Sequence, residues 1–226
     1  MAQAGIHSIV GMAVKKWTPE RTWLLLGIIL GSMLPDADNI AVAVATVAKL
    51  PADGLHRTFT HSLFTIVAVW VVFYIVARIT RQPRWNNLGI GLGIGILLHI
   101  LLDLLIWFNG VAILWPIPSW INFWSGVTPP VWFDKLMLTA EFLFFALFFM
   151  GLSTLARRQG TDLEYMRRLR TWTWLEFDLF LIFTALVYFM QKGFMTPYGL
   201  VYLLSLGLAV GVTIRMRKTV DMSVKG

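Results

Sequence analysis

Residues 56–77 read HRTFTHSLFTIVAVWVVFYIVA, a polar segment with two histidines followed by an unbroken apolar run. Counted over residues 62–79, this run approaches the length of about 20 residues that a helix needs to cross the hydrocarbon core of a bilayer. Backbone polar groups in that core must bond to one another, which favours helices. The stretch therefore predicts a transmembrane helix with imidazole groups at its beginning.

The rest of the chain has the same character. It is 58% apolar and only 14% charged, compared with about 25% charged residues in ordinary soluble domains. Apolar segments before residue 61, including residues 40–50, are shorter and predict short membrane-embedded helices. We expect an all-α, polytopic membrane protein with a single domain over residues 1–226, in which residues 1–118 carry the motifs and residues 119–226 form a C-terminal helical part. Full spans are predicted over residues 62–79, 87–108, 133–156, 173–190 and 198–214.

The net charge of +7 comes from short basic clusters between the apolar runs. Lys and Arg concentrate in the cytoplasmic loops of membrane proteins, so we interpret the charge as a signal of topology and expect no nucleic-acid partner. Loop 109–132 has no Lys or Arg, whereas residues 157–172 contain five Arg. This pattern predicts an inner-membrane protein with loop 109–132 outside and residues 157–172 inside. It leaves the oligomeric state open.

Ionisable residues that are scattered along the sequence converge on one depth. At a rise of about 1.5 Å per residue, Asp36, His99, Asp103 and Glu141 fall in the outer half of the membrane, level with the HRTFTHS segment. Each has a simpler interpretation: the pair at 99 and 103 could tie two helices together, and Asp36 and Asp38 could be ordinary helix-end carboxylates. Thr60 or Ser62 could cap the following helix. Ionisable groups within spans are nevertheless expensive and usually functional.

A metal site explains the cluster best. The chain has no cysteine, and imidazole with carboxylate is a ligand set of catalytic zinc that also suits manganese or iron. One catalytic zinc needs about three protein ligands and a water. The surplus of ligands predicts either two ions or a generous outer shell. Separately, the small residues Gly89, Gly91, Gly93 and Gly95 predict close helix packing.

Five motifs occur in the order IHSIVG, LPDADN, HRTFTHS, HILLD and ILWPIP, between residues 6 and 118. In this order they resemble the YdjM-like family of membrane-bound, metal-dependent hydrolases. Many members of that family carry histidine at the position of Asn39. The resemblance implies a functional role, as metal ligands, for His7, Asp36, Asp38, His56, His61, His99 and Asp103.

We therefore expect a hydrolase that uses a metal-activated water on a lipid-like or phosphoester substrate, with membrane lipids as its surroundings. The preferred ligands are Asp36, His61, His99 and Asp103. Asp38 and His56 are further ligands or acid–base groups, and Glu141 is a further catalytic candidate. Arg57 could hold an anionic substrate group or anchor the chain at the membrane interface. The alternative is a non-catalytic metal-binding membrane protein, either a transporter or a sensor.

Overall fold

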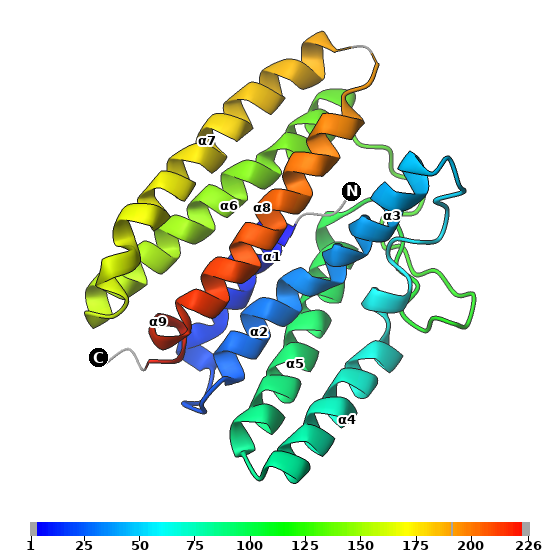
Figure 1. Ribbon diagram of the computed structural model, residues 1–226. Helices are drawn as coiled ribbons and strands as arrows, with labels where there is room; N and C mark the ends of the chain where they lie inside the picture. The colour runs from blue at the N-terminus through cyan, green and yellow to red at the C-terminus, as the bar shows by residue number, and fades with distance from the viewer. Residues whose placement is uncertain (1–3, 191, 223–226) are drawn as a thin grey trace.

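The structure is a computed structural model that describes residues 4–190 and 192–222. Among these residues every regular element is a helix, and there is no strand (Figure 1). An isolated β-bridge between Val111 and Ile121 closes a loop. The elements are α1 (Ala4–Ala13), η1 (Val14–Trp17), α2 (Leu24–Met33), η2 (Leu34–Asp38), α3 (Asn39–Val47), η3 (Phe59–His61), α4 (Leu63–Thr80), α5 (Pro83–Ile106), α6 (Val131–Gln159), η4 (Leu163–Tyr165), α7 (Met166–Phe189), α8 (Met195–Arg215) and α9 (Arg217–Asp221).

The five spans predicted from the sequence correspond to α4, α5, α6, α7 and α8, each long and apolar enough to cross a membrane. The structure adds a sixth candidate, Leu24–Val47, because α2, η2 and α3 follow one another without a break. Pro35 stands at the beginning of η2, where its fixed backbone angle and missing N–H are tolerated. The sequence predicted separate short helices in this part of the chain. That prediction is wrong for α2 and α3, which η2 joins into one candidate span.

Glycines allow α2 and α5 to approach until their backbones touch. A Cβ added to Gly27 would lie 2.5 Å from the carbonyl oxygen of Leu88, and one added to Gly95 would meet the backbone of Ile28 and Ser32. Real side chains do not fit at such distances, so small residues are required on both helices. This contact confirms the close packing predicted for the glycine-rich segment. It also fixes the end of α2, and hence η2, against α5.

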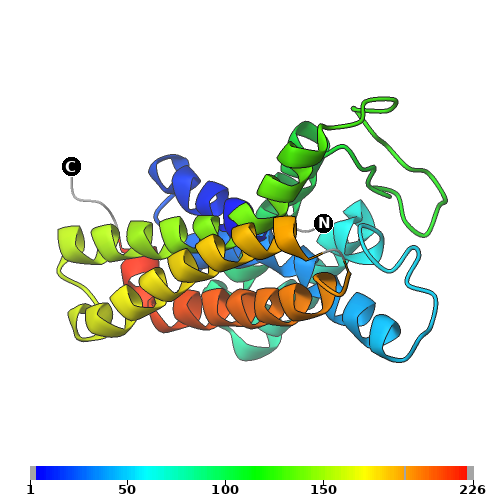
Figure 2. The same cartoon turned by 90° about the horizontal axis from the view of Figure 1, so that it is seen from above.

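Helices α6, α7 and α8 form a second layer beside α2 and α5. In Figures 1 and 2, α6, α7 and α8 run side by side on one flank, and α4 packs against the outer side of α5 on the other. The short helix α1 contacts both α2 and α6 and so joins the two layers. Most of the buried core lies among α2, α6 and α8, with phenylalanines of α6 at its centre.

The two ends of the bundle differ in charge. The α4–α5 turn, the α6–α7 turn, η1 and α9 lie at one end, and loops 48–62 and 107–130 lie at the other (Figure 1). The basic clusters noted in the sequence therefore collect at the first end. This arrangement agrees with the orientation expected from the distribution of Lys and Arg.

Candidate metal centre

Four parts of the fold bring the predicted residues together. Helix α1 supplies one histidine, the α2–η2–α3 span supplies two aspartates, and α5 supplies a histidine and an aspartate one turn apart. The loop that leads through η3 into α4 supplies the rest. Three overlapping groups have ligand atoms within 4.8 Å of one another and could hold a metal ion: His7, His99 and Asp103; Asp36, His61 and His99; Asp38, His56 and His61.

Two imidazoles and two carboxylates form the centre of the cluster. The Nε2 atoms of His61 and His99 lie 3.0 Å apart. Oδ1 of Asp36 lies 3.6 Å from His99 Nε2 and 3.9 Å from His61 Nε2. Oδ2 of Asp103 lies 3.6 Å from His61 Nε2 and 3.8 Å from His99 Nε2. All four side chains are at most 1% exposed.

The hydrogen bond at the far side of His99 determines where its proton is. His99 Nδ1 lies 2.8 Å from the carbonyl oxygen of Ser32, and a carbonyl oxygen can only accept. Nδ1 of His99 therefore carries the proton. In the neutral ring, Nε2 is left with a free lone pair, which points to His61 and the carboxylates.

His61 is fixed in the same tautomer by a longer relay. The hydroxyl of Thr60 lies 2.8 Å from Asp38 Oδ2 and 2.9 Å from His61 Nδ1. Because a carboxylate only accepts, the hydroxyl donates to Asp38 and accepts from Nδ1–H of His61. Burial, followed by the nearby His99, holds the pKa of the His61 imidazole well below its usual value. The ring is therefore neutral at pH 7, with its lone pair at Nε2.

These groups fit a metal ion. Two nitrogen lone pairs face each other at 3.0 Å, a repulsive arrangement that a cation between them would relieve. Among the described residues, both oxygens of Asp36 and Oδ2 of Asp103 are buried without a hydrogen-bond partner, although a buried carboxylate is costly unless its oxygens are paired. Bonds of about 2.0–2.1 Å to a tetrahedral ion place the ligands about 3.4 Å apart. The five distances above, from 3.0 to 3.9 Å, bracket that value.

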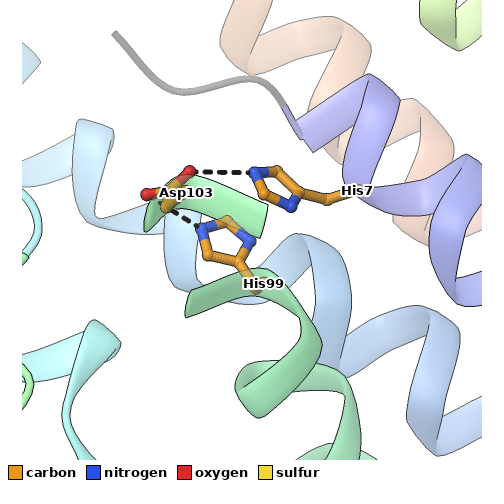
Figure 3. Close-up of side chains that lie close together, drawn as sticks. All are labelled: His7, His99 and Asp103. Carbon is orange, nitrogen blue, oxygen red and sulfur yellow. Dashed lines mark hydrogen bonds and ion pairs between the residues drawn. The ribbon is translucent and has the colours of Figure 1, made fainter. Parts of the chain in front are cut away.

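His7 extends the cluster toward α1. Its ring stacks on that of His99, with centroids 3.6 Å apart, and its Nε2 lies 3.2 Å from Oδ1 of Asp103. Figure 3 shows that both rings point to this carboxylate from different helices. Asp103 therefore presents one oxygen to His7 and the other to the central pair. His7 is therefore the third imidazole beside the Asp103 carboxylate, together with His61 and His99.

The more accessible edge of the cluster is formed by Asp38 and His56. His56 Nδ1 lies 2.7 Å from Asp38 Oδ1, and the His56 side chain is 20% exposed. Its other nitrogen, Nε2, makes no hydrogen bond. The second oxygen of Asp38 accepts from the backbone N–H of Arg57 and from Thr60. Asp38 thus bonds directly to the partly exposed imidazole of His56 and, through Thr60, fixes the tautomer of the buried His61.

Arg57 lies in the cluster and not at the membrane interface. Its side chain is only 3% exposed, and Nε lies 3.3 Å from Asp103 Oδ2. Nη1 donates to the carbonyl oxygen of Asn109 at 3.2 Å, and Nη2 is buried without a hydrogen-bond partner. The interfacial-anchor interpretation is therefore wrong for this side chain. A guanidinium with an unused N–H remains beside the carboxylates.

Glu141 is placed differently from the other candidates. It is fully buried on α6, and its Oε1 accepts from the backbone N–H of Gly5 at 2.7 Å. Glu141 therefore bonds to the first turn of α1 at Gly5, which precedes His7 by two residues and Ser8 by three. None of the described contacts joins Glu141 to an imidazole of the cluster. Its geometry positions α1, and with it His7.

Sequence reasoning missed the groups that orient the ligands. Of the two candidate caps, Ser62 caps α4 by accepting from the N–H of Phe64, whereas Thr60 links Asp38 to His61. The position of Thr60 inside HRTFTHS was the available signal. The carbonyl of Ser32 carries none, because every residue has a carbonyl. Asn39 donates to the carbonyl oxygen of Asp36 at 2.9 Å and so braces η2.

Comparisons with known proteins support the assignment of the chain to a family. No curated protein and no solved structure matches it. A sequence profile of the YdjM inner membrane protein family matches residues 2–195. The match extends well beyond the last motif at residue 118 and includes every residue of the candidate metal centre. With most of its length matched, all of its spans helical and its motif residues gathered in one buried cluster, this chain belongs to the YdjM inner membrane protein family.

Proposed function

We propose that the protein is a membrane-embedded, metal-dependent hydrolase that cleaves a phosphoester bond in an amphiphilic, lipid-like substrate. One observation carries the proposal: Nε2 of His61 and Nε2 of His99 face each other at 3.0 Å with their protons committed elsewhere. The oxygens of Asp36 beside them have no hydrogen-bond partner. Such a set of neutral imidazoles and carboxylates is what a catalytic divalent metal requires.

Asp36, His61, His99 and Asp103 are the residues that would hold the metal, and zinc suits their nitrogen and oxygen donors, with manganese or iron as other candidates. A second ion could bind with His7 or with His56, since each belongs to a further candidate group. A bound zinc supplies two effects: it lowers the pKa of a water to about 7 and polarises a phosphoryl oxygen.

His56 and Asp38 are suited to proton transfer. Asp38 holds Nδ1 of His56 at 2.7 Å, which leaves Nε2, a buried atom with no hydrogen-bond partner among the described residues, to take up or release a proton inside the site. The carboxylate stabilises the ring when it is protonated and fixes its orientation. Asp38 itself is held by Arg57 N–H and Thr60, so it cannot turn away. General acid–base help of this kind is typically worth about 10²–10⁴-fold in rate.

Arg57 would bind the anionic group of the substrate. Its guanidinium is oriented by Asp103 and by the carbonyl of Asn109, and Nη2 remains unpaired. A planar guanidinium matches phosphate geometry better than an ammonium does. The buried cation therefore favours a phosphoester over a neutral ester.

The depth of the site favours a lipid-like substrate. His99 stands 16 positions after Pro83, the first residue of α5, and 7 positions before Ile106, the last. These intervals correspond to about 24 Å and 10 Å along the helix. Basic clusters occupy the distant end, so from the positive-inside rule we infer a site toward the outer leaflet. A substrate that reaches it must enter the bilayer at least in part.

Metal analysis and turnover measurements with three proteins test the proposal. Wild-type protein in detergent should carry about one or two zinc ions per chain and hydrolyse short-chain phospholipid or phosphodiester analogues. His56→Gln should keep the ion of the central ligands and lose about 10²–10⁴-fold in turnover, because it removes the proton-transfer group and none of those ligands. His61→Ala should lose both metal and turnover. If the wild type binds metal but shows no metal-dependent hydrolysis across a broad phosphoester panel, the protein is a metal-binding transporter or sensor instead.

A further inference from the structure

A groove separates α3 from α8 beside the metal centre. The two helices lie side by side in both views, at the end of the bundle that holds loops 48–62 and 107–130 (Figures 1 and 2). The groove has a volume of about 390 Å³, which falls within the range of about 300–1,000 Å³ that is usual for small-molecule sites. Both walls belong to candidate membrane spans. Two such walls make hydrocarbon chains of the bilayer the natural neighbours of the groove.

The walls of the groove are largely apolar. Helix α3 presents Val42, Ala43 and Val47, and α8 presents Leu203 together with Gly199. A Cβ added to Gly199 would meet nothing within 4 Å, so the missing side chain accounts for part of the space. A groove of about 390 Å³ with apolar walls suits one hydrocarbon chain.

The polar end of the groove reaches the carboxylates of the metal centre. Asn39 lines the groove, and its amide donates to the carbonyl oxygen of Asp36 at 2.9 Å and lies 3.5 Å from Asp38 Oδ1. Tyr202 lines it from α8, is 4% exposed, and its hydroxyl is buried without a hydrogen-bond partner. An apolar slot that ends in two polar groups next to a metal centre matches an amphiphile.

We propose that this groove binds one acyl chain of a membrane phospholipid, with the polar part of the lipid directed to Asn39 and Tyr202. The occupant comes from the surrounding bilayer, because both walls belong to candidate spans and α3 also carries the exposed apolar residues Ile40 and Val44 next to the groove. That the bound lipid is also the substrate rests on the function proposed above. Binding in the groove would then hold the phosphoester beside the metal ligands.

Two glycines of α8 offer a matched pair of variants. Gly199→Leu fills the groove, whereas Gly207→Leu makes the same change two turns along the helix, away from the groove residues. A Cβ at either position meets nothing within 4 Å, so neither change strains the packing. Leucine is also a better helix former than glycine. Both variants should therefore fold with unchanged thermal stability and metal content.

The probe is phosphatidylglycerol with a photoactivatable diazirine in one acyl chain, reconstituted with the full chain in vesicles. After irradiation, mass spectrometry maps the labelled peptides. Labelling per residue at 39–47 and 195–203 should exceed that on α4, whose apolar face is merely exposed to lipid. Gly199→Leu should reduce this labelling about tenfold, equivalent to about 1.4 kcal/mol of binding, and Gly207→Leu should leave it unchanged. Equal labelling of α4 and the groove, or an unchanged signal in Gly199→Leu, would overturn the proposal.

Photolabelling requires no turnover, which separates this proposal from the hydrolase. If the wild type is labelled in the groove and Gly199→Leu is not, the lipid site stands even when no phosphoester is hydrolysed. If a lipid phosphoester is hydrolysed equally by wild type and Gly199→Leu and the groove is not labelled, the lipid site is refuted and the hydrolase stands.

Discussion

Replacing Thr60 with valine tests whether the relay from Asp38 to His61 creates the metal site. The hydroxyl of Thr60 is the only feature that the substitution removes, since valine has nearly the same shape. In the wild type it donates to Asp38 at 2.8 Å and accepts from His61 Nδ1 at 2.9 Å. Without it, the nearest atom of Asp38 lies 3.5 Å from His61 Nδ1, too far for a good hydrogen bond.

The expected effect is a weaker affinity for metal in a folded protein. His61 would no longer be held in the tautomer that presents the Nε2 lone pair, and its ring would be free to rotate. Loss of an outer partner of a metal-ligating histidine typically costs about 10–100-fold in affinity. This corresponds to about 1.4–2.7 kcal/mol. The lower value is expected if Asp38 moves to bond His61 directly.

Competition with a zinc chelator in detergent measures the dissociation constant of each variant. Thr60→Ser retains the hydroxyl and should bind zinc within about twofold of the wild type, a difference of about 0.4 kcal/mol. Thr58→Val makes the same chemical change two residues earlier, where the hydroxyl bonds only the carbonyl oxygen of Gly54. It should leave the affinity unaltered.

Wild-type affinity in Thr60→Val would refute the tautomer argument and with it the role of the relay. An equal loss in Thr58→Val would show that the loop around η3, and not the relay, controls the affinity.

Four further outcomes are expected. Gly31→Leu should destabilise the protein by at least about 1–3 kcal/mol, measured as a lower melting temperature in detergent, because its side chain would overlap the backbone of α5. Asp36→Asn should weaken zinc binding by about 100-fold or more in a chelator titration, since losing a ligand costs more than losing an outer partner. Glu141→Gln should keep its zinc, because its carboxyl bonds Gly5 N–H. A cysteine at Ser125 should react with an impermeant maleimide added outside, and one at Gln159 should not.

The controls follow from the same structure. Gly207→Leu lies on an open face of α8 and should retain the wild-type melting temperature; a loss equal to that of Gly31→Leu would remove the close-packing argument. Equal zinc affinity in Asp36→Asn and the wild type would remove Asp36 from the ligands. The reverse pattern of maleimide labelling would invert the topology and place the site in the inner leaflet.

The sequence by itself determined the helical class, five of the spans and the gathering of ionisable residues at one level. These are local properties. A long apolar run cannot leave its backbone unpaired in lipid, and the fixed rise of a helix converts a position such as His99 into a depth. The glycines of α5 likewise indicate a close contact, because small residues are what such a contact needs.

Sequence reasoning was less successful at the beginning of the chain. The α2 and α3 segments are each too short to span, and only the structure shows that η2 connects them in one direction. Spacing along a single helix carries no information about a junction between helices. For the same reason Glu141 was grouped with the cluster by depth, although its carboxyl turns to Gly5.

Only the tertiary structure decided how the polar residues act. Which nitrogen of His99 is free depends on the carbonyl of Ser32, a backbone group 67 positions away, and the free nitrogen of His61 depends on Asp38 through Thr60. The groove between α3 and α8 likewise exists only where two distant helices meet. The fixed rise of a helix lets the depth of a residue be counted along the chain. Histidine tautomers, the facing lone pairs of His61 and His99 and the groove between α3 and α8 depend instead on which segments, distant in the sequence, come into contact.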